Sequence, residues 1–196
     1  ETHFEYVSPR FCQILKVDAE TVLQDAKAAL SRVHPEDITS LMATSQSARS
    51  GLKPFRWEGR FVIDEEVRWM RIASNPAPIQ DGRVVWVGVI SDITEAKRTA
   101  LSLNLASQVF RNAREGMMIT DLNNKIIDVN NAFTDITGYM REDVIAQDPG
   151  LLSSGRHSDQ YFADMWQKLQ AEHYWSGEFW NRRKSGELYM QRTSIS

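Results

Sequence analysis

The sequence predicts an α+β fold in which two copies of one domain follow each other, each with short helices on one face of an antiparallel sheet. Two observations carry this prediction. Three segments of the first half return in the same order in the second half, ~120 residues later. In both halves the pattern runs from a β-rich start through short helical segments to β-rich runs separated by turn residues.

The internal repeat consists of three pairs of matching segments. One match of this length could arise by chance, but three in one order and at a nearly constant offset indicate a duplicated domain. The pairs are residues 7–14 (VSPRFCQI) with 129–136 (VNNAFTDI), 57–61 (WEGRF) with 175–179 (WSGEF), and 67–70 (VRWM) with 188–190 (LYM).

The first copy, residues 1–93, is expected to start with a strand and to end with three strands. A short helix surrounds Phe11, and a longer helix carries Pro35 in its first turn, where the missing N–H costs nothing. Asp81 and Gly82 suit the turn between the last two strands. The predicted ranges are 3–7 for the first strand, 35–48 for the longer helix, and 54–63, 67–77 and 83–90 for the three closing strands.

The second copy, residues 115–196, repeats this order. Asn130 and Asn131 suit the start of a short helix that carries Phe133 and Ile136, and Ser158 suits the N-cap of a longer helix. The apolar residues of that longer helix fall at helical spacing; they are Tyr161, Phe162, Met165, Trp166 and Leu169. The predicted strands are 116–120 and 125–129 around the polar turn 121–124, and 175–183 and 187–195 around the turn 184–186.

Residues 94–114 are predicted to form a helical linker, because they lack Gly and Pro and are rich in Ala, Leu, Lys and Arg. As a helix of about twenty residues the linker would be ~30 Å long. Two interpretations stay open: a linker on a domain surface, or a dimerising coiled coil. The second rests on an approximate heptad seam, made by Ile93, Ala96, Ala100, Leu103 and Phe110.

The composition argues against several classes of function and site. The net charge of −3 and the scattered Lys and Arg give no reason to expect nucleic-acid binding. The single cysteine, Cys12, excludes an internal disulfide and a cysteine-rich metal site, and fits a reducing cytoplasm. The longest apolar run, 84–90, is far shorter than the ~20 residues of a membrane span. Because the chain starts with Glu1, we expect it to be part of a longer protein, with any membrane anchor elsewhere.

Several of these segments resemble the PAS family of sensor domains, and the resemblance covers almost the whole chain. Its most specific part is the Asp-Ile-Thr-Glu run at 92–95, the family's usual junction between the last strand and the output helix. In the first copy the carriers are 34–37 (HPED), 67–69 (VRW) and 87–98 (VGVISDITEAKR). In the second they are 132–139 (AFTDITGY), 151–157 (LLSSGRH), 175–178 (WSGE) and 181–187 (NRRKSGE).

The resemblance implies a five-stranded antiparallel sheet with helices on one face, and any ligand between the sheet and the helices. The first copy lacks the family's opening strand, and the second stops before the closing strand. Either both copies are truncated, which we favour, or other chains complete their sheets.

The resemblance also implies a candidate cofactor, flavin (FAD), in the second copy. Redox-sensing PAS domains that hold FAD carry a similar Trp-Ser-Gly and Asn-Arg-Arg-Lys pattern, and Asn181 and Gln191 match flavin-contacting positions. Light-sensing flavin domains need a reactive cysteine where this chain has Pro149, so that photochemistry is not expected. The candidate binding residues are Phe133, Ile136, Trp175, Phe179, Asn181 and Gln191. The alternatives are a pocket that takes a small metabolite or one that is filled by its own side chains.

Strand alternation supports this site. It places Gly177, Phe179 and Asn181 on one face of their strand, and Tyr189, Gln191 and Thr193 on one face of the next. Amide side chains at these points would form hydrogen bonds with the polar edge of a flavin ring, and Trp175 and Phe133 would supply apolar walls.

No catalytic constellation is found, so we do not expect an enzyme. His34, Glu36 and Asp37 suggest a helix start with acids at its positive end rather than a metal site. Cys12 has no partner in a nucleophilic motif and resembles a small buried helix residue. No phosphate-binding glycine loop occurs.

The sequence thus predicts a sensory or regulatory module. A small ligand, a redox state or a partner would shift the packing of one or both domains, and helices would carry the shift to an output domain of the same chain. The motifs of the second copy resemble those ahead of diguanylate cyclase or phosphodiesterase domains, with histidine kinases next. A homodimer is expected, without nucleic acid or membrane contact. The rival interpretation is a ligand-free scaffold for dimerisation.

Overall fold

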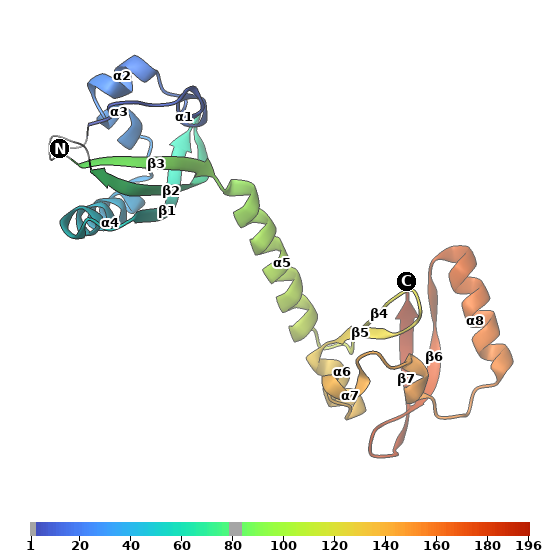
Figure 1. Ribbon diagram of the computed structural model, residues 1–196. Coiled ribbons are helices and arrows are strands. Elements are labelled where there is room, and N and C mark those ends of the chain that lie inside the picture. The colour runs from blue at the N-terminus through green and yellow to red at the C-terminus, as the bar shows by residue number, and fades with distance from the viewer. Residues whose placement is uncertain (1–2, 79–83) are drawn as a thin grey trace. The chain divides into compact units, whose positions relative to one another are not determined.

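The computed structural model describes residues 3–78 and 84–196. The chain divides into two compact units, Glu1–Ser102 (unit 1) and Leu103–Ser196 (unit 2). The division falls inside a helix, α5 (Thr94–Asn112), which occupies the predicted linker (Figure 1). In the described part of the chain, no helix combines the length and the apolar character that a membrane crossing requires.

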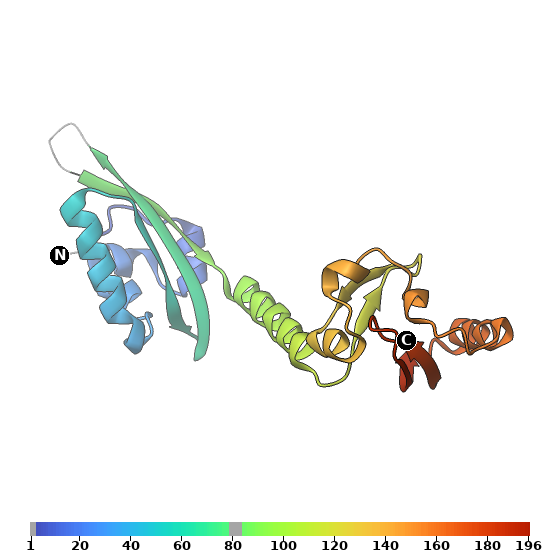
Figure 2. The ribbon, with the colours of Figure 1, turned by 90° about the horizontal axis from the view of Figure 1, so that it is seen from below.

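Unit 1 contains short helices followed by a three-stranded antiparallel sheet whose strands pair in chain order. Figure 2 shows the helices on one side of this sheet. The elements before α5 are α1 (Pro9–Leu15), α2 (Ala19–Gln24), α3 (Lys27–Leu30), the 3₁₀ helix η1 (Pro35–Asp37), α4 (Ile38–Gly51), β1 (Phe55–Ile63), β2 (Glu66–Pro78) and β3 (Val84–Asp92).

The core of unit 1 lies between the helices and the sheet. Alternate residues of β1 are buried, as expected for a strand with one covered face. Helix α1 starts where Ser8 accepts a hydrogen bond from the Phe11 amide, with Pro9 in the first turn. The buried core residues include Leu15, Val22, Val33, Leu41, Phe55, Trp57, Phe61, Ile63 and Met70.

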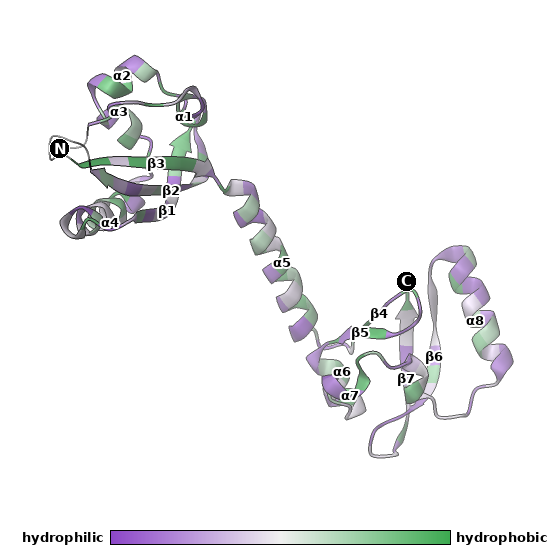
Figure 3. Cartoon of the chain, in the orientation of Figure 1, coloured by the Kyte–Doolittle hydropathy of each residue, from purple (hydrophilic) through white to green (hydrophobic). Residues whose placement is uncertain are grey.

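Strand β3 is apolar on both faces (Figure 3). Trp86 and Ile90 pack against the core of unit 1, whereas Val87 and Val89 point away from it and are 65% and 66% exposed. Strands with two apolar faces are typical of sheets that are covered on both sides.

One element predicted for unit 1 is wrong, and two are missing from the prediction. Residues 3–7 do not form a strand, since they pair with none of the described strands. Instead, Phe4 packs against the ring of Phe11 at 5.7 Å, and Val7 joins the core. Helices α2 and α3 were not predicted. The predicted turn at Asp81 and Gly82 lies outside the described residues.

Unit 2 contains two separate two-stranded antiparallel sheets and four helical segments of one to four turns. The elements are β4 (Met118–Thr120), β5 (Ile126–Val129), α6 (Asn131–Thr137), α7 (Arg141–Val144), the 3₁₀ helix η2 (Pro149–Leu152), α8 (Asp159–Glu172), β6 (Trp175–Arg182) and β7 (Leu188–Ile195). Apart from α7 and η2, these elements were predicted. The predicted N-caps Asn130 and Ser158 are both confirmed.

Asn130 organises the start of unit 2. It is 2% exposed, and its Oδ1 accepts hydrogen bonds from the amides of Phe133 and Met117, both at 2.9 Å. Its amide nitrogen donates to the Glu115 carbonyl at 2.8 Å. This one side chain therefore ties the segment that follows α5 to the start of α6.

The described sheets are smaller than the five-stranded sheet that the family resemblance implies. Unit 1 has three paired strands, and unit 2 has two pairs that do not join each other. The mixture of helices with antiparallel sheets nevertheless confirms the predicted α+β class in both units.

The repeated Trp-x-Gly segment has the same structural cause in both units. The indole of Trp57 lies over Gly59, and the indole of Trp175 lies over Gly177, each two residues along the same strand face. A Cβ on either glycine would lie 2.2 or 2.3 Å from ring carbons of that tryptophan. Glycine is thus required so that the indole can lie flat on the strand.

Candidate functional site

The inner face of the β6–β7 hairpin gathers the residues of the predicted site. Phe179 lies directly opposite Gln191, and Asn181 lies opposite Tyr189. Directly paired residues of an antiparallel sheet share a face, so Asn181 and Gln191 point to the same side on adjacent strands. The predicted strand alternation is therefore confirmed.

Aromatic rings from α8 pack onto this face. Trp175 lies 5.0 Å from Phe179, and Phe162 stacks on Phe179 at 6.0 Å. Tyr161 meets Trp175 edge-on at 6.2 Å, and His157 stacks on Tyr161 at 4.3 Å. The apolar part of this face is therefore largely covered by the protein's own rings.

The polar part of the same face contains a buried hydroxyl without a partner. Among the described residues, no group is placed to form a well-aligned hydrogen bond with the Tyr189 hydroxyl. The Asn181 side chain is nevertheless near enough to act against the rise in the pKa of this hydroxyl. Burial raises the pKa of this hydroxyl, and the Arg183 guanidinium, which lies over the ring at 4.4 Å, opposes the shift. Buried polar groups almost always have partners, so this orphan hydroxyl suggests a ligand atom or a water here.

These groups fit the polar edge of a flavin. Asn181 offers an amide that is 8% exposed, and Gln191 donates to the Thr193 hydroxyl at 2.9 Å, which leaves its carbonyl oxygen available. Together with the Tyr189 hydroxyl, both amides provide donors and acceptors on one sheet face. That arrangement can recognise a ring that carries alternating N–H and C=O groups.

Phe133 and Ile136 lie elsewhere in unit 2. Phe133 belongs to a second buried cluster with Ile126, Val129 and Val144. Ile136 lines an open surface hollow of about 390 Å³ between the end of α5 and α6. The structure therefore brings four of the six predicted residues together on one hairpin and gives these two a different packing role. Their assignment to one binding site stays a prediction.

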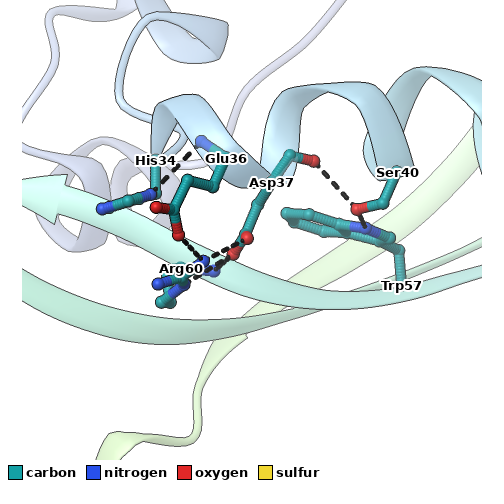
Figure 4. A network of polar contacts seen from close by, with 6 residues as sticks. All are labelled: His34, Glu36, Asp37, Ser40, Trp57 and Arg60. Atoms are coloured by element: carbon teal, nitrogen blue, oxygen red, sulfur yellow. Dashed lines mark hydrogen bonds and ion pairs between the residues drawn. The ribbon is translucent and has the colours of Figure 1, made fainter.

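The acidic segment before α4 in unit 1 forms a polar network (Figure 4). Asp37 accepts hydrogen bonds from the amide, Nε and terminal nitrogen of Arg60 at 2.7, 3.0 and 2.6 Å. Glu36 accepts from the same guanidinium at 2.8 Å. The Arg60 side chain lowers the pKa of the Asp37 carboxyl to about 2. These acids therefore fasten the start of α4 to β1, and sequence reasoning missed their partner Arg60.

A second network joins the sheet of unit 1 to the first turn of α5. The Thr94 hydroxyl accepts from the Trp69 amide at 3.0 Å and donates to Asp92 at 2.6 Å. The Ile93 amide donates to the Trp69 carbonyl at 2.8 Å. Strand β2 is thus bonded directly to the first turn of the linker helix.

Lys97, one turn further along α5, adds charge to this junction. Its ammonium lies 2.8 Å from a Glu58 oxygen and 5.1 Å from the Trp69 ring centre. Arg71 binds the other oxygen of Glu58 at 2.8 Å. Lys97 first, and then Arg71, lower the pKa of the Glu58 carboxyl. Three elements, β1, β2 and α5, therefore meet at one carboxylate.

Comparison with known families decides the identity of both units. Residues 4–90 match the family described as PAS fold, and residues 114–196 match the family described as PAS domain. The chain belongs to the PAS family. Its two units are tandem PAS domains, as the repeat predicted.

Curated relatives of this PAS chain are regulators and receptors. It is 35% identical over 84 residues to the nitrogen fixation regulatory protein of Klebsiella oxytoca, covering 43% of this chain and 17% of that protein. It is 36% identical over 81 residues to the aerotaxis receptor of Escherichia coli, covering 40% and 15%. The chain thus spans less than a fifth of the length of these relatives.

Solved PAS structures are also similar to the chain. A PAS domain from Colwellia psychrerythraea has 22% identity and a TM-score of 0.45, covering 47% of this chain and 79% of that one. The N-terminal domain of a diguanylate cyclase with a PAS/PAC sensor from Marinobacter aquaeolei has 20% identity and a TM-score of 0.43, covering 48% and 88%.

Proposed function

We propose that this chain is a sensory and regulatory module without catalytic activity of its own. One or both PAS domains perceive a small ligand, a redox state or a partner, and helices pass the change to an output domain of the same protein. The observation that carries the proposal is the bonded junction between β2 and α5, through Thr94 and Trp69. A rearrangement of the sheet in unit 1 would therefore move the first turn of α5, because the two are joined by hydrogen bonds.

The output domain is proposed from the motifs of the second PAS domain. Its sequence resembles PAS domains found ahead of diguanylate cyclases or phosphodiesterases, and then of histidine kinases. The regulatory and receptor names of the curated relatives agree with such a role. We also propose a cytoplasmic location, with the free Cys12 as support.

FAD is the ligand proposed for the second PAS domain. A bound flavin would supply a ring whose hydrogen-bonding edge changes with its redox state. Asn181 and Gln191 would orient that edge, and the buried Tyr189 hydroxyl would donate a hydrogen bond to an acceptor atom of the ligand. The aromatic cluster would exclude water from the ring, provided that Phe179 or Phe162 moves aside.

A binding experiment tests the ligand. FAD added to the purified protein should give a protein-bound visible flavin spectrum and raise the melting temperature. Gln191→Ala should weaken binding by roughly tenfold or more, because a buried polar contact is lost. The matched control is Arg192→Ala, on the exposed face of the same strand, which should bind as the wild type does. Absence of any bound flavin in the wild type would reject FAD as the ligand.

The second candidate function is a ligand-free scaffold that dimerises. It is favoured by α5, where Leu101, Leu105 and Val109 follow one another at a spacing of four residues along one side and are between 52% and 68% exposed. Exposed apolar helix faces of this kind mark association surfaces. A concentration-dependent homodimer that shows no thermal response to any ligand would support the scaffold. A ligand response would support sensing.

A further inference from the structure

The outer edge of β6, which is turned away from β7, is covered by one isolated β-bridge, between Ser153 and Asn181, and otherwise by side chains. The Trp180 amide donates to Nε2 of His157 at 2.8 Å, and the Ser154 hydroxyl donates to the Trp180 carbonyl. The Tyr161 hydroxyl donates to the Glu178 carbonyl at 2.8 Å. Edge strands need such protection because their free backbone groups otherwise stay unpaired.

His157 can make its bond in one protonation state only. An imidazole nitrogen accepts a hydrogen bond only while it carries no proton, so the neutral ring must hold its proton on Nδ1. A second proton, on Nε2, would turn the acceptor into a donor and place it against the Trp180 amide. Two facing donors repel each other, and the edge bond is lost.

Aromatic rings hold the His157 ring in place. It stacks on Tyr161 at 4.3 Å and meets Phe162 and Phe179 edge-on at 6.1 and 5.8 Å. A ring packed in this way has little freedom to turn its other nitrogen toward Trp180. Protonation therefore has to displace the ring or the segment that carries it.

Charged and titratable groups surround this position on every element that contacts it. The Tyr161 hydroxyl of α8 is already bonded to β6. Arg156 on the same segment lies over the Trp180 ring at 4.5 Å, and Arg182 of β6 donates to the Ser154 carbonyl at 3.1 Å. Asp159 lies in the first turn of α8, and the Glu178 side chain is exposed on β6.

The first PAS domain protects its corresponding edge with different chemistry. There the Arg60 amide of β1 donates to an oxygen of Asp37 at 2.7 Å. A carboxylate that is held by a guanidinium remains an acceptor down to strongly acidic pH. Each of the two tandem domains thus has an edge-strand amide that donates to a side chain, a carboxylate in the first domain and an imidazole in the second.

We propose that His157 is a pH-dependent latch of the second PAS domain, by which we mean that its hydrogen bond to the Trp180 amide forms only while Nε2 carries no proton. Neutral His157 fastens the end of segment 153–158 to β6, and uptake of one proton by Nε2 breaks this bond and loosens the segment next to α8, while the Ser154 and Tyr161 bonds to β6 remain. Because Tyr161 of α8 also packs on Trp175, the loosening would also alter the ring packing on the inner face of the β6–β7 hairpin. This inference is independent of the proposed flavin, since its ligand is a proton.

Amide hydrogen exchange tests the latch, with the Arg60 amide as an internal control. After correction for intrinsic rates, the protection of the Trp180 amide should fall roughly tenfold between about pH 8 and pH 5.5, while that of Arg60 changes less than about twofold. His157→Gln, whose side-chain carbonyl accepts at every pH, should abolish the fall. Constant Trp180 protection in the wild type, or the same fall in His157→Gln, would overturn the proposal.

The imidazole nitrogen resonances of the wild type provide a second test that needs no variant. At about pH 8 they should report a neutral ring with its proton on Nδ1. A ring protonated at Nε2 at that pH would exclude the latch, whatever the fate of the variant.

Discussion

At the scale of single residues, charge holds a helix start to the sheet of the first PAS domain, and shape holds one tryptophan against a strand in each domain. Asp37 acts through charge, because its carboxylate neutralises a half-buried guanidinium and accepts a backbone N–H. Trp57 and Trp175 act through shape, because each covers a glycine.

Asp37→Asn should destabilise the first domain by about 1–3 kcal/mol, because the Arg60 guanidinium then keeps only the exposed carboxylate of Glu36 as its anion. Urea unfolding measures this, and Glu36→Gln is the control, since Glu36 is 72% exposed and should cost less than about 0.5 kcal/mol. The folded-state pKa of Asp37, about 2, lies below the ordinary 3.8. Its contribution is therefore present above pH 3.8 and is lost as pH falls toward 2. Equal costs for the two variants would contradict the assigned role.

Gly177→Ala should destabilise the second domain by about 1–3 kcal/mol, because the new methyl group would overlap the Trp175 ring. Tryptophan fluorescence during unfolding reports both the stability and the displaced indole. Ser176→Ala, the neighbour on the exposed face, should change stability by less than about 0.5 kcal/mol. If alanine is tolerated at Gly177 without any indole shift, the explanation of the Trp-x-Gly repeat fails.

At the scale of elements, the Asp-Ile-Thr-Glu segment explains why the linker helix starts at a fixed place. Thr94 is 9% exposed and serves two strands at once, as acceptor for Trp69 and donor to Asp92. The helix therefore cannot rotate or shift relative to β2 without breaking these bonds.

Thr94→Val keeps the size of the side chain and removes its hydroxyl, which leaves the Trp69 amide unpaired. We expect the unfolding free energy of the first domain to fall by about 1–3 kcal/mol, with faster amide exchange in the first turn of α5. Thr99→Val, on an exposed part of the same helix, controls for the lower helix propensity of valine. Unchanged exchange at the first turn would show that the junction does not hold α5.

The elements with a clear period, cap or turn could be predicted from sequence, including the short strands β4 and β5, and the shortest helices could not. Helix α8 is predicted by its apolar period and its N-cap Ser158. Hairpin β6–β7 is predicted by its alternation and by its turn, where Gly186 has a φ of 91°. Helices α2, α3 and α7 have only four to six residues, too few for a period to be recognised. Residues 3–7 look like a strand, but a strand depends on a neighbour that sequence pattern cannot supply.

The candidate site was predictable only in part for a similar reason. Asn181, Gln191, Trp175 and Phe179 lie on one hairpin, so alternation alone places them together. Phe133 and Ile136 come from α6, and their distance from the hairpin depends on tertiary packing. The orphan hydroxyl of Tyr189 and the edge bond of His157 could not be foreseen, because both depend on atoms that lie far apart in the sequence.

At the scale of the whole molecule, two PAS domains with separate cores are joined by one helix whose two ends are fastened differently. The first turn is bonded to β2, and the segment after the last turn is bonded to Asn130 at the start of α6. In the relay that we propose, a change in either domain would act on α5 through these bonds.

Amide hydrogen exchange over the full chain, with and without saturating FAD, tests whether ligand binding in the second domain reaches α5. We expect slower exchange in β6 and β7 when FAD binds, together with a changed exchange rate in α5. Protection of the hairpin with α5 unaffected would contradict the relay. Identical exchange throughout the chain would contradict ligand sensing by FAD.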